Sequence, residues 1–522
     1  MSINATSLAA GVGSSVKNVQ FVSEALNVPR KVLIIGTYDP AKTGIANEVP
    51  VRVLSDTEVG ATYGFGSMLH RLAIAAYKGS NGVETWIQPQ AEAGGAVAAA
   101  GSFDFAGSTG IKAGTVYLYI AGDAVPFTIT DSDTANSTAI KAAAAINAIK
   151  NLPVTAAVDG VTLSKVNVTA KSKGPFGNGI SIAFNLAAGE ALPTGVTVAV
   201  IAMASGAGVP TIANALNALG TGDSANENYF TDVVHGYMQD STSLTAISAY
   251  VGEGNGFTGL YTKTVARPFR VLTGDVAAGT AGLNAMIAIT DTRKQDRANG
   301  ILAVPDSPSH PSEIAAQAMG IMARINNDRA AEHYNGQLLS GVWPGDKGAD
   351  RWTSDYDNRD IAIKASISPT RVISGAVYLQ NVVTFYRPDN VPVSSNGYRS
   401  MRNISILQNI LFNIGLNFSQ EKWQGISIVS DVVKVGNVND RKKARDIDSV
   451  KDDLVNLAKS FEDHAWIYSS DFTIGKLKEA GAVVIRTGTT GFDSTLSVIL
   501  SGEGGILDTV TEFDTSIAVL TA

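Results

Sequence analysis

Strand and helix patterns alternate along two separate stretches of this chain, and the gap between the stretches limits the possible folds. Residues 31–37 (KVLIIGT) have the pattern of a buried strand, residues 66–79 that of a helix with one apolar face, and residues 83–89 that of a second strand. The alternation breaks near Ala91 and resumes near Gly195. Strands that alternate with helices predict a sheet covered by helices. We therefore expect a discontinuous α/β core domain formed by residues 31–100 and 201–345.

The interrupting segment, residues 101–200, has a different pattern of residues. Thr and Val recur at period two in several short runs, including residues 114–122 (GTVYLYIAG) and 165–172 (KVNVTAKS), which favours half-buried strands. One helix pattern lies between them, at residues 134–151. The segment predicts a β-rich domain inserted into the core domain.

Beyond the core domain, the turn-rich sequence that starts at Gly341 (GVWPGDKGADRW) marks a domain boundary. Residues 309–330, just before it, form the clearest helix pattern in the chain. After it we expect an α+β domain over residues 346–500. Its helices are predicted at 400–418 and 449–466, and its strands at 424–435, 482–488 and 494–502, with a long strand or hairpin arm at 376–388. The fold class is therefore α/β plus α+β, with several domains.

Both ends of the chain have the pattern of extended arms. Residues 1–30 are small and polar without a helical period, and their apolar positions include Val16, Val19 and Phe21. At the other end, residues 502–505 (GEGG) form a glycine joint, and an alternating run that includes Phe513, Ile517 and Val519 follows within the arm 501–522. A lone terminal strand needs a sheet to join, either its own or that of a neighbouring subunit.

Composition excludes several classes of function. The 522 residues contain no Cys, which removes disulfides, thiol catalysis and Cys-ligated metals, and a net charge of −7 argues against nucleic acid as the main partner. Charged residues make up only 17% of the chain, so much of its surface cannot consist of solvated Lys and Glu. A protein that buries surface against copies of itself has such a composition. The first residues lack the pattern of a secretion signal, and no apolar run is long enough to span a membrane.

The sequence contains no motif that specifies catalysis. The five His residues are far apart, and HExxH, GxSxG and GxxxxGK[ST] patterns are absent. Asp306, Ser307, Ser309 and His310 are close in sequence, but a catalytic triad is assembled by the fold and rarely from sequence neighbours. We expect no catalytic residue, cofactor or metal.

One basic cluster is formed by Arg441, Lys442, Lys443 and Arg445. Its plainer interpretation is a solvated helix start. The functional interpretation is a contact with an acidic partner surface. Such a cluster would guide the association and orientation of the partners more than it would raise their affinity.

Three ordered segments carry a resemblance to contractile tail sheath proteins of myophages, with most similarity to the Mu-like branch. They are the inserted segment with LPVTAAVDG and VTAKSKGPFGNGISIAF, the segment AVPDSPSHPSEIAAQAMGIMARINNDRA, and IAIKASISPTRVISGAVYLQNVVTFYRPD. The third segment departs from the pattern at Leu379–Asn381, where an Arg often stands, and at Phe385, where a Thr often stands. Local contacts are therefore not transferred from the family.

The resemblance implies a subtilisin-like α/β sheath core and a subunit that forms stacked hexameric rings around a tail tube. It implies arms at residues 16–25 and 510–521 that add strands to the 346–500 domain of neighbours. Arg441 to Arg445 would face the tube. It also implies partners in the tail tube, baseplate and tail terminator proteins, no cofactor, no direct nucleic-acid contact, no membrane insertion, and assembly in the host cytoplasm into the virion tail. Three alternatives stay open: the sheath of a related device such as an R-type pyocin, a serine hydrolase, and a secreted β-rich surface protein.

Overall fold

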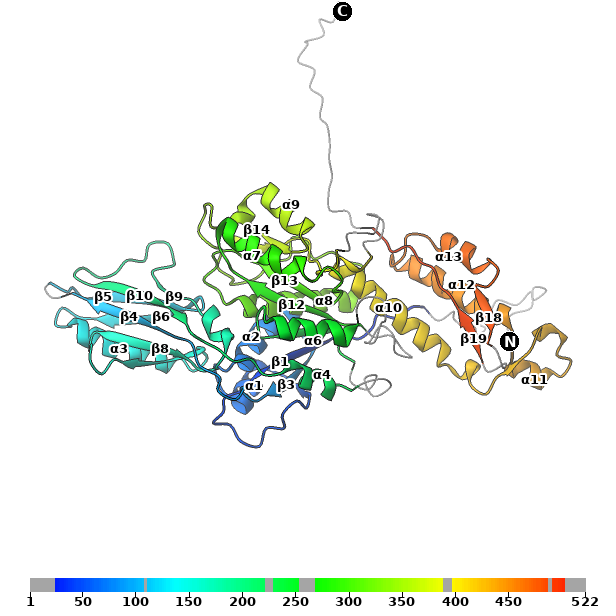
Figure 1. Cartoon of the computed structure of the whole chain (residues 1–522), viewed down its shortest axis with the longest axis horizontal. Coiled ribbons are helices and arrows are strands. Elements are labelled where there is room, and N and C mark those ends of the chain that lie inside the picture. Colours follow the sequence, from blue (N-terminus) through cyan, green and yellow to red (C-terminus); the bar gives the residue numbers. More distant parts are fainter. Residues whose placement is uncertain are drawn as a thin grey trace, which may run out of the picture. The chain divides into compact units, whose positions relative to one another are not determined.

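The computed structural model describes residues 24–107, 110–220, 229–252, 268–387, 397–486 and 491–502. The chain has a mixed α/β fold and separates into two compact units (Figure 1). In the described part of the chain, residues 27–415 with 500–502 form the large unit, and residues 416–499 with 24–26 form the C-terminal unit. The boundary falls inside helix α10 (Met401–Phe418). No helix in the described ranges is long and apolar enough to cross a membrane.

An eight-stranded sheet organises the large unit, in the order β15-β14-β13-β12-β11-β1-β3-β2. Its neighbours run parallel from β14 to β3, whereas β2 and β15 join the two edges antiparallel. The strands are β1 (Lys31–Thr37), β2 (Val51–Val53), β3 (Glu84–Gln90), β11 (Asp232–His235), β12 (Arg270–Asp275), β13 (Asn299–Ala303), β14 (Ser368–Ile373) and β15 (Ala376–Leu379). The strand–helix alternation thus forms a sheet of the expected kind.

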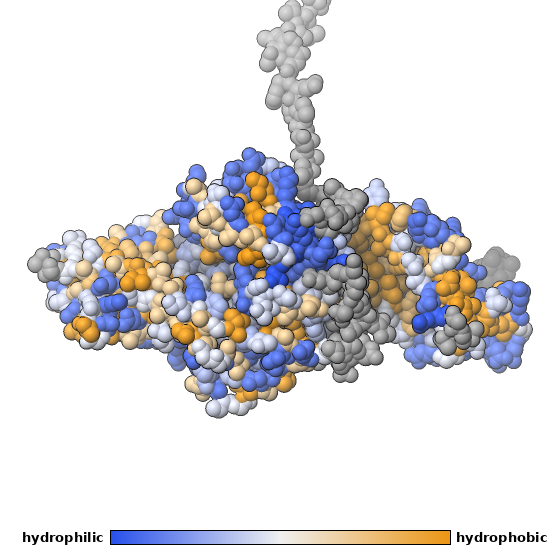
Figure 2. Space-filling model, viewed as in Figure 1, coloured by the Kyte–Doolittle hydropathy of each residue, from blue (hydrophilic) through white to orange (hydrophobic). Residues whose placement is uncertain are grey.

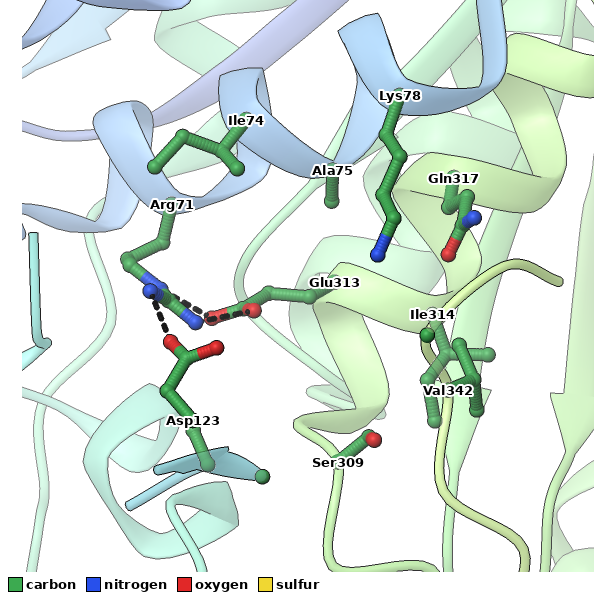
Figure 3. A pocket seen from close by; sticks show the side chains of 13 residues that line it. Arg71, Ile74, Ala75, Lys78, Asp123, Ser309, Glu313, Ile314, Gln317 and Val342 are labelled. Carbon is green, nitrogen blue, oxygen red and sulfur yellow. Dashed lines mark hydrogen bonds and ion pairs between the residues drawn. The ribbon is translucent and has the colours of Figure 1, made fainter. Parts of the chain in front are cut away.

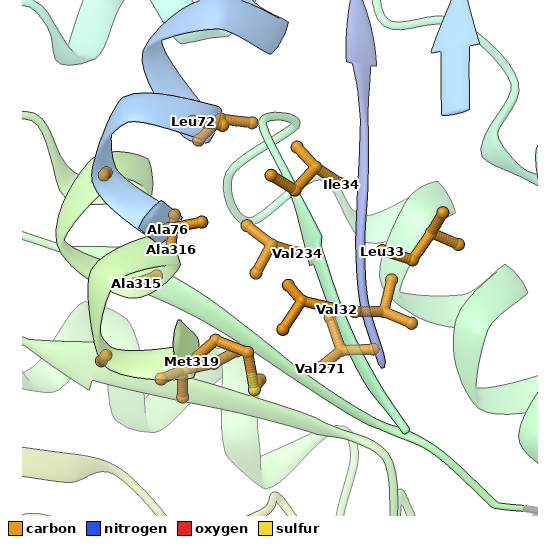
Figure 4. Packing of buried hydrophobic residues seen from close by; sticks show 14 of the residues in the cluster. Val32, Leu33, Ile34, Leu72, Ala76, Val234, Val271, Ala315, Ala316 and Met319 are labelled. Carbon is orange, nitrogen blue, oxygen red and sulfur yellow. The ribbon is translucent and has the colours of Figure 1, made fainter. Parts of the chain in front are cut away.

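Helices cover both faces of this sheet. Successive side chains of a strand point to opposite faces, so each buried strand contributes apolar side chains to both layers of the core. On β13, Leu302 belongs to the cluster packed under α2 and α8, while Ile301 belongs to a cluster with residues of α6 and α7. Figure 4 shows part of the first cluster, in which Ile34 of β1 and Val234 of β11 lie toward α2 and α8, whereas Leu33 lies on the opposite side of β1. The helices of the unit are α1 (Asp56–Tyr63), α2 (Met68–Ser80), α4 (Ile212–Ala218), α6 (Ser241–Val251), α7 (Gly279–Asp291), α8 (Pro311–Asp328) and α9 (Tyr356–Lys364).

Glycine lets α2 and α8 pack backbone to backbone. A Cβ atom on Gly79 would lie 2.2 Å from the carbonyl oxygen of Gln317, and one on Gly320 would lie 2.4 Å from that of Ala76. Any side chain at either position would force the two helices apart.

The inserted segment forms two antiparallel sheets and one helix around its own hydrophobic cluster. The sheets have the orders β10-β4-β8-β7 and β6-β5-β9. Their elements are β4 (Ala100–Ala106), β5 (Gly114–Ile120), β6 (Asp123–Ile129), α3 (Ala135–Ala148), β7 (Val154–Val158), β8 (Lys165–Ala170), β9 (Ile182–Phe184) and β10 (Thr197–Ala204). The segment is β-rich, as predicted.

Two predicted domain limits do not coincide with edges of these sheets. Strand β10 crosses residue 200 and pairs with β4, so it closes the inserted segment instead of reopening the core. Strands β14 and β15 lie beyond residue 346 and extend the main sheet. The turn-rich stretch after Gly341 is a surface connection. Just before it, Leu339 donates its backbone N–H to the carbonyl of Val377 in β15, which holds the chain at the sheet edge.

The C-terminal unit consists mainly of helices, with two very small sheets. Helix α12 buries the predicted apolar stripe, which includes Leu454, Leu457 and Phe461, and Asp446 caps its first turn with Ser449. The elements are β16 (Ser427–Ile428), α11 (Val438–Lys443), β17 (Ala444–Arg445), α12 (Ile447–Asp463), α13 (Ser470–Leu477), β18 (Val483–Ile485) and β19 (Phe492–Ser494).

Two of the three long strands predicted for this region were wrong. The run 424–435 is a strand only over β16, and the run 494–502 contains only the last residue of β19, Ser494. The run 376–388 was predicted as a long strand or a hairpin arm, and its first four residues form β15, the second arm of a hairpin with β14. β-Propensity shows that a segment fits a pleated surface, but a strand forms only where a partner offers backbone groups.

Candidate functional site

The basic cluster lies at the end of a short helix. Helix α11 starts at the Asn437 cap and places Arg441, Lys442 and Lys443 in its last turn, and Arg445 follows in β17. Cations are favoured there, because the carbonyl ends of a helix carry partial negative charge. The expectation of a helix start was therefore wrong, since the next helix begins only at Ile447.

Backbone carbonyls hold three of the four cations in place. Arg441 Nε donates to the carbonyl of Val435 (2.8 Å), and Lys443 Nζ lies 3.3 Å from the carbonyl oxygens of Glu421 and Gln424. Arg445 donates to the carbonyl of Lys422 (2.7 Å), and its guanidinium lies over the ring of Trp423 at 5.6 Å. Arg441, Lys442 and Lys443 are exposed and Arg445 is half-buried. The structure thus gathers the four predicted residues on one oriented, solvent-facing positive patch.

Carboxylates next to the patch are already engaged. Asp453 accepts hydrogen bonds from Asn417 and Trp423 and pairs with Lys422 at 2.8 Å. Asp446 accepts from Ser449 and from the backbone of Val432. Burial alone would raise the pKa of Asp446, but these hydrogen bonds lower it overall. These two carboxylates are therefore engaged with groups other than the exposed cations of the patch.

The two sheets of the C-terminal unit contain only two strands each among the described residues. β16 pairs with β17 over two residues, and β18 pairs with β19 over three. An isolated pair of strands is marginally stable in water, so such pairs gain most from an added strand. Figure 2 shows hydrophobic side chains on the visible face of this unit. The exposed large apolar residues of the unit include Val433, Val438, Tyr468, Phe472, Val484 and Ile499.

The predicted arm residues fall outside the described part of the chain. This applies to Val16, Val19 and Phe21 and to Phe513, Ile517 and Val519. Their pairing with a sheet stays a prediction.

The Asp306–His310 segment cannot act as a nucleophilic triad. Both ring nitrogens of His310 are used, because Nδ1 accepts the N–H of Ser312 and Nε2 lies 2.9 Å from the carbonyl oxygen of Phe176. Ser307 donates to the carbonyl of Trp343, and Ser309 accepts the N–H of Trp343. Burial lowers the pKa of His310 to about 3, so it is neutral and holds the helix start.

An ion-pair group with a buried arginine and an exposed aspartate joins the inserted segment to the core. Figure 3 shows Arg71 of α2 between Asp123 of β6 and Glu313 of α8, at 2.7 Å from each carboxylate. Burial raises the pKa of Glu313, and the charge of Arg71 opposes that rise. The adjoining cavity is about 100 Å³, well below the usual size of a ligand pocket. These groups hold two parts of the large unit together, and sequence spacing gave no signal for them.

No metal site is found in the described ranges, where no three His, Asp or Glu side chains come together in a way that could hold an ion.

Comparison with known proteins gives one informative relative. No family model matches the chain. The Mu-like prophage FluMu tail sheath protein of Haemophilus influenzae is 26% identical over 425 residues, which is 80% of each protein. This relative confirms the resemblance to Mu-like tail sheath proteins that the three sequence segments indicated.

Three solved structures have a broad likeness to the chain. Sheath tail proteins from Desulfitobacterium hafniense and Listeria innocua are 11% and 12% identical, both with a TM-score of 0.42, and each alignment covers 92% of this chain and 94% of the other. The sheath of an extracellular contractile injection system in its contracted state is 10% identical with a TM-score of 0.44, covering 98% of this chain and 99% of that one. With TM-scores below 0.5, these likenesses carry no argument about mechanism.

Proposed function

We propose that this chain is a structural subunit of a contractile phage tail sheath. In this proposal, subunits polymerise as stacked hexameric rings around a tail tube, and contraction drives the tube through the host envelope. The observation that carries the proposal is the relative whose similarity extends over 80% of both proteins. The subunit acts through assembly and movement, and it is not an enzyme.

The incomplete sheets of the C-terminal unit support exchange of arms between subunits. Two-residue and three-residue strand pairs offer open backbone edges, and the alternating run around Phe513, Ile517 and Val519 has the pattern of a strand without a sheet. A donated strand adds several backbone hydrogen bonds at about 1 kcal/mol net each. Arms from residues 16–25 and 510–521 would therefore link neighbouring subunits through this unit.

The low charge of the chain supports extensive burial between subunits, because only 17% of its residues are charged. We assign the outer surface of the sheath to the α/β core, with its subtilisin-like architecture, and to the inserted segment. The C-terminal unit would then lie near the tube, with Arg441 to Arg445 facing it. The remaining partners would be the baseplate and tail terminator proteins, and the product would be part of a virion tail that assembles in the host cytoplasm.

Electron microscopy of the purified protein tests the proposal. We expect hollow tubes with a sixfold cross-section, wide enough to surround a tail tube. If only monomers form, the preparation is repeated with a tail tube protein present. Monodisperse monomers under both conditions would contradict the proposal, because a sheath subunit must self-associate around its tube.

A further inference from the structure

A buried polar group lies at the amino ends of the parallel strands in the large unit. Arg30 immediately precedes β1, Asp232 begins β11 and Arg270 begins β12, and all three are almost fully buried. Ligands of open α/β sheets usually bind at the opposite, carboxyl ends of the strands. The position of this group therefore favours a mechanical role over ligand binding.

Arg270 has its own set of partners in this group. Its side chain pairs with Asp232, donates to the hydroxyl of Tyr334 and to Asn326, and also donates to the carbonyl of Met401 at 3.0 Å. The ion pair and the hydrogen bonds use most of the guanidinium. The carboxylate of Asp232 is thereby committed to Arg270 and to the hydroxyl of Thr231.

Arg30 has no carboxylate of its own. Its guanidinium donates to Gln408 Oε1 and Ser405 Oγ, which lie on neighbouring turns of α10. Burial and the charge of Arg270 lower the pKa of Arg30 to about 10, so it stays charged at neutral pH. Without Arg30, the buried Oε1 of Gln408 and Oγ of Ser405 would lose this donor, and leaving a buried acceptor without its donor destabilises the folded state. Arg30 is therefore held by hydrogen bonds to helix α10 and not by an opposite charge of its own.

Gln408 connects Arg30 to the strands. Its Nε2 donates to the carbonyls of Thr231 (3.0 Å) and Pro268 (2.9 Å), which precede β11 and β12, while its Oε1 accepts from Arg30. One amide thus links the N-terminal segment, helix α10 and two strands of the main sheet.

The residues before β1 are held by side chains and not by a sheet. The N–H of Val28 donates to Asn409 Oδ1 at 2.8 Å, and Asn27 Nδ2 donates to the carbonyl of Asp328 at 2.7 Å. The N–H of Arg30 lies 3.4 Å from Asn327 Oδ1. Helix α10 and the end of α8 thus form a holder for residues 27–30, at the point where the N-terminal arm enters the large unit.

We propose that Arg30 and Gln408 are positioning residues that fix the root of the N-terminal arm. A pulling force on the arm is then transmitted to α10 and to the amino ends of β11 and β12. Residues 27–30 stay bound to the large unit under this force. The source of that force, a neighbouring subunit that holds the arm, rests on the proposed sheath function. The anchoring itself does not depend on it.

Hydrogen–deuterium exchange of the soluble protein tests the anchor with Arg30→Met. We expect the amide of Val28 to exchange about thirtyfold faster, the factor for two lost hydrogen bonds at about 1 kcal/mol each, with a smaller change at amides of the large unit that open without residues 27–30. Arg71→Met is the matched control, because Arg71 is another buried arginine of the same unit and does not contact the arm root. It should leave the exchange of Val28 unchanged.

Two results would overturn the inference. One is unchanged exchange at Val28 in Arg30→Met. The other is an equal acceleration of exchange at amides throughout the large unit, which would make Arg30 a general stabilising residue. If the wild-type protein forms tubes, tubes of Arg30→Met should dissociate at a lower urea concentration. If the wild type forms no tubes, the proposed sheath function is contradicted. The anchoring role of Arg30 would then be judged from the exchange of Val28 alone.

Discussion

Eight hydrogen-bonded strands form the main sheet of the large unit, whereas the described strands of the C-terminal unit pair only two by two. The large sheet is covered on both faces by helices of the same chain, and its buried charges have partners within the chain. The C-terminal unit buries one face of α12 but leaves its small sheets open at their edges. The large unit thus holds its strands in one extended sheet, whereas the C-terminal unit has short strand pairs that donated strands would extend under the proposed function.

The largest effect on this comparison is expected from removal of the C-terminal arm. Deletion of residues 508–522 should abolish tube formation and leave a folded monomer, because under the proposed function the arm completes a sheet of another subunit, and the described strands of the main sheet all end by Leu379. Negative-stain microscopy measures the tubes, and circular dichroism checks the monomer. Normal tubes from the deleted protein would rule out the arm as an essential link.

A second test weakens the large unit by removing one partner of its buried ion pair. Arg270→Met leaves Asp232 buried without its partner and should cost about 3–5 kcal/mol of unfolding free energy. Urea unfolding measures the loss. The double variant with Asp232→Leu is the control, since removing both charges should restore much of the stability. A loss below about 1 kcal/mol in the single variant would show that this ion pair does not support the sheet.

The pH dependence of the large unit gives a third, smaller effect. Burial lowers the pKa of His235 to about 4 and that of His310 to about 3, whereas an unfolded histidine titrates near 6.5. Between these values the unfolded chain binds more protons, so stability falls as the pH drops below about 6.5, by about 1.4 kcal/mol per pH unit for each histidine. His310→Gln should reduce the slope of urea stability against pH by about one proton. An unchanged slope would contradict the assignment.

The smallest effect is expected at the basic patch of the C-terminal unit. Charge reversal with Arg441→Glu and Lys442→Glu should weaken assembly on a tail tube at low salt, by less than about tenfold, and have little effect at about 0.5 M salt, where exposed charges are screened. Co-sedimentation with tube protein measures the binding. Reversal of Lys459 and Lys478, exposed lysines of the same unit outside the patch, is the control. Equal effects of both pairs would mean that the patch has no specific partner.

Local pattern predicted much of the fold. The apolar stripes of α2, α8 and α12 and the buried runs of β1, β12 and β13 lie where their periodicity placed them. It did not predict that β10 pairs with β4 or that β14 and β15 join the main sheet. It also gave no sign that Arg30 meets Gln408, although an Arg directly before an apolar strand was visible.

The sequence by itself determined the long helices and the buried strands of the main sheet, because side-chain periodicity is read within a few residues. The ordered motifs of the chain also determined the resemblance to tail sheath proteins. Only the tertiary structure decided which strands share a sheet, which histidines are buried and neutral, and which arginines have carboxylate partners. Those contacts join residues far apart in the chain, as with the 378 positions between Arg30 and Gln408, and burial and pairing exist only once such segments meet.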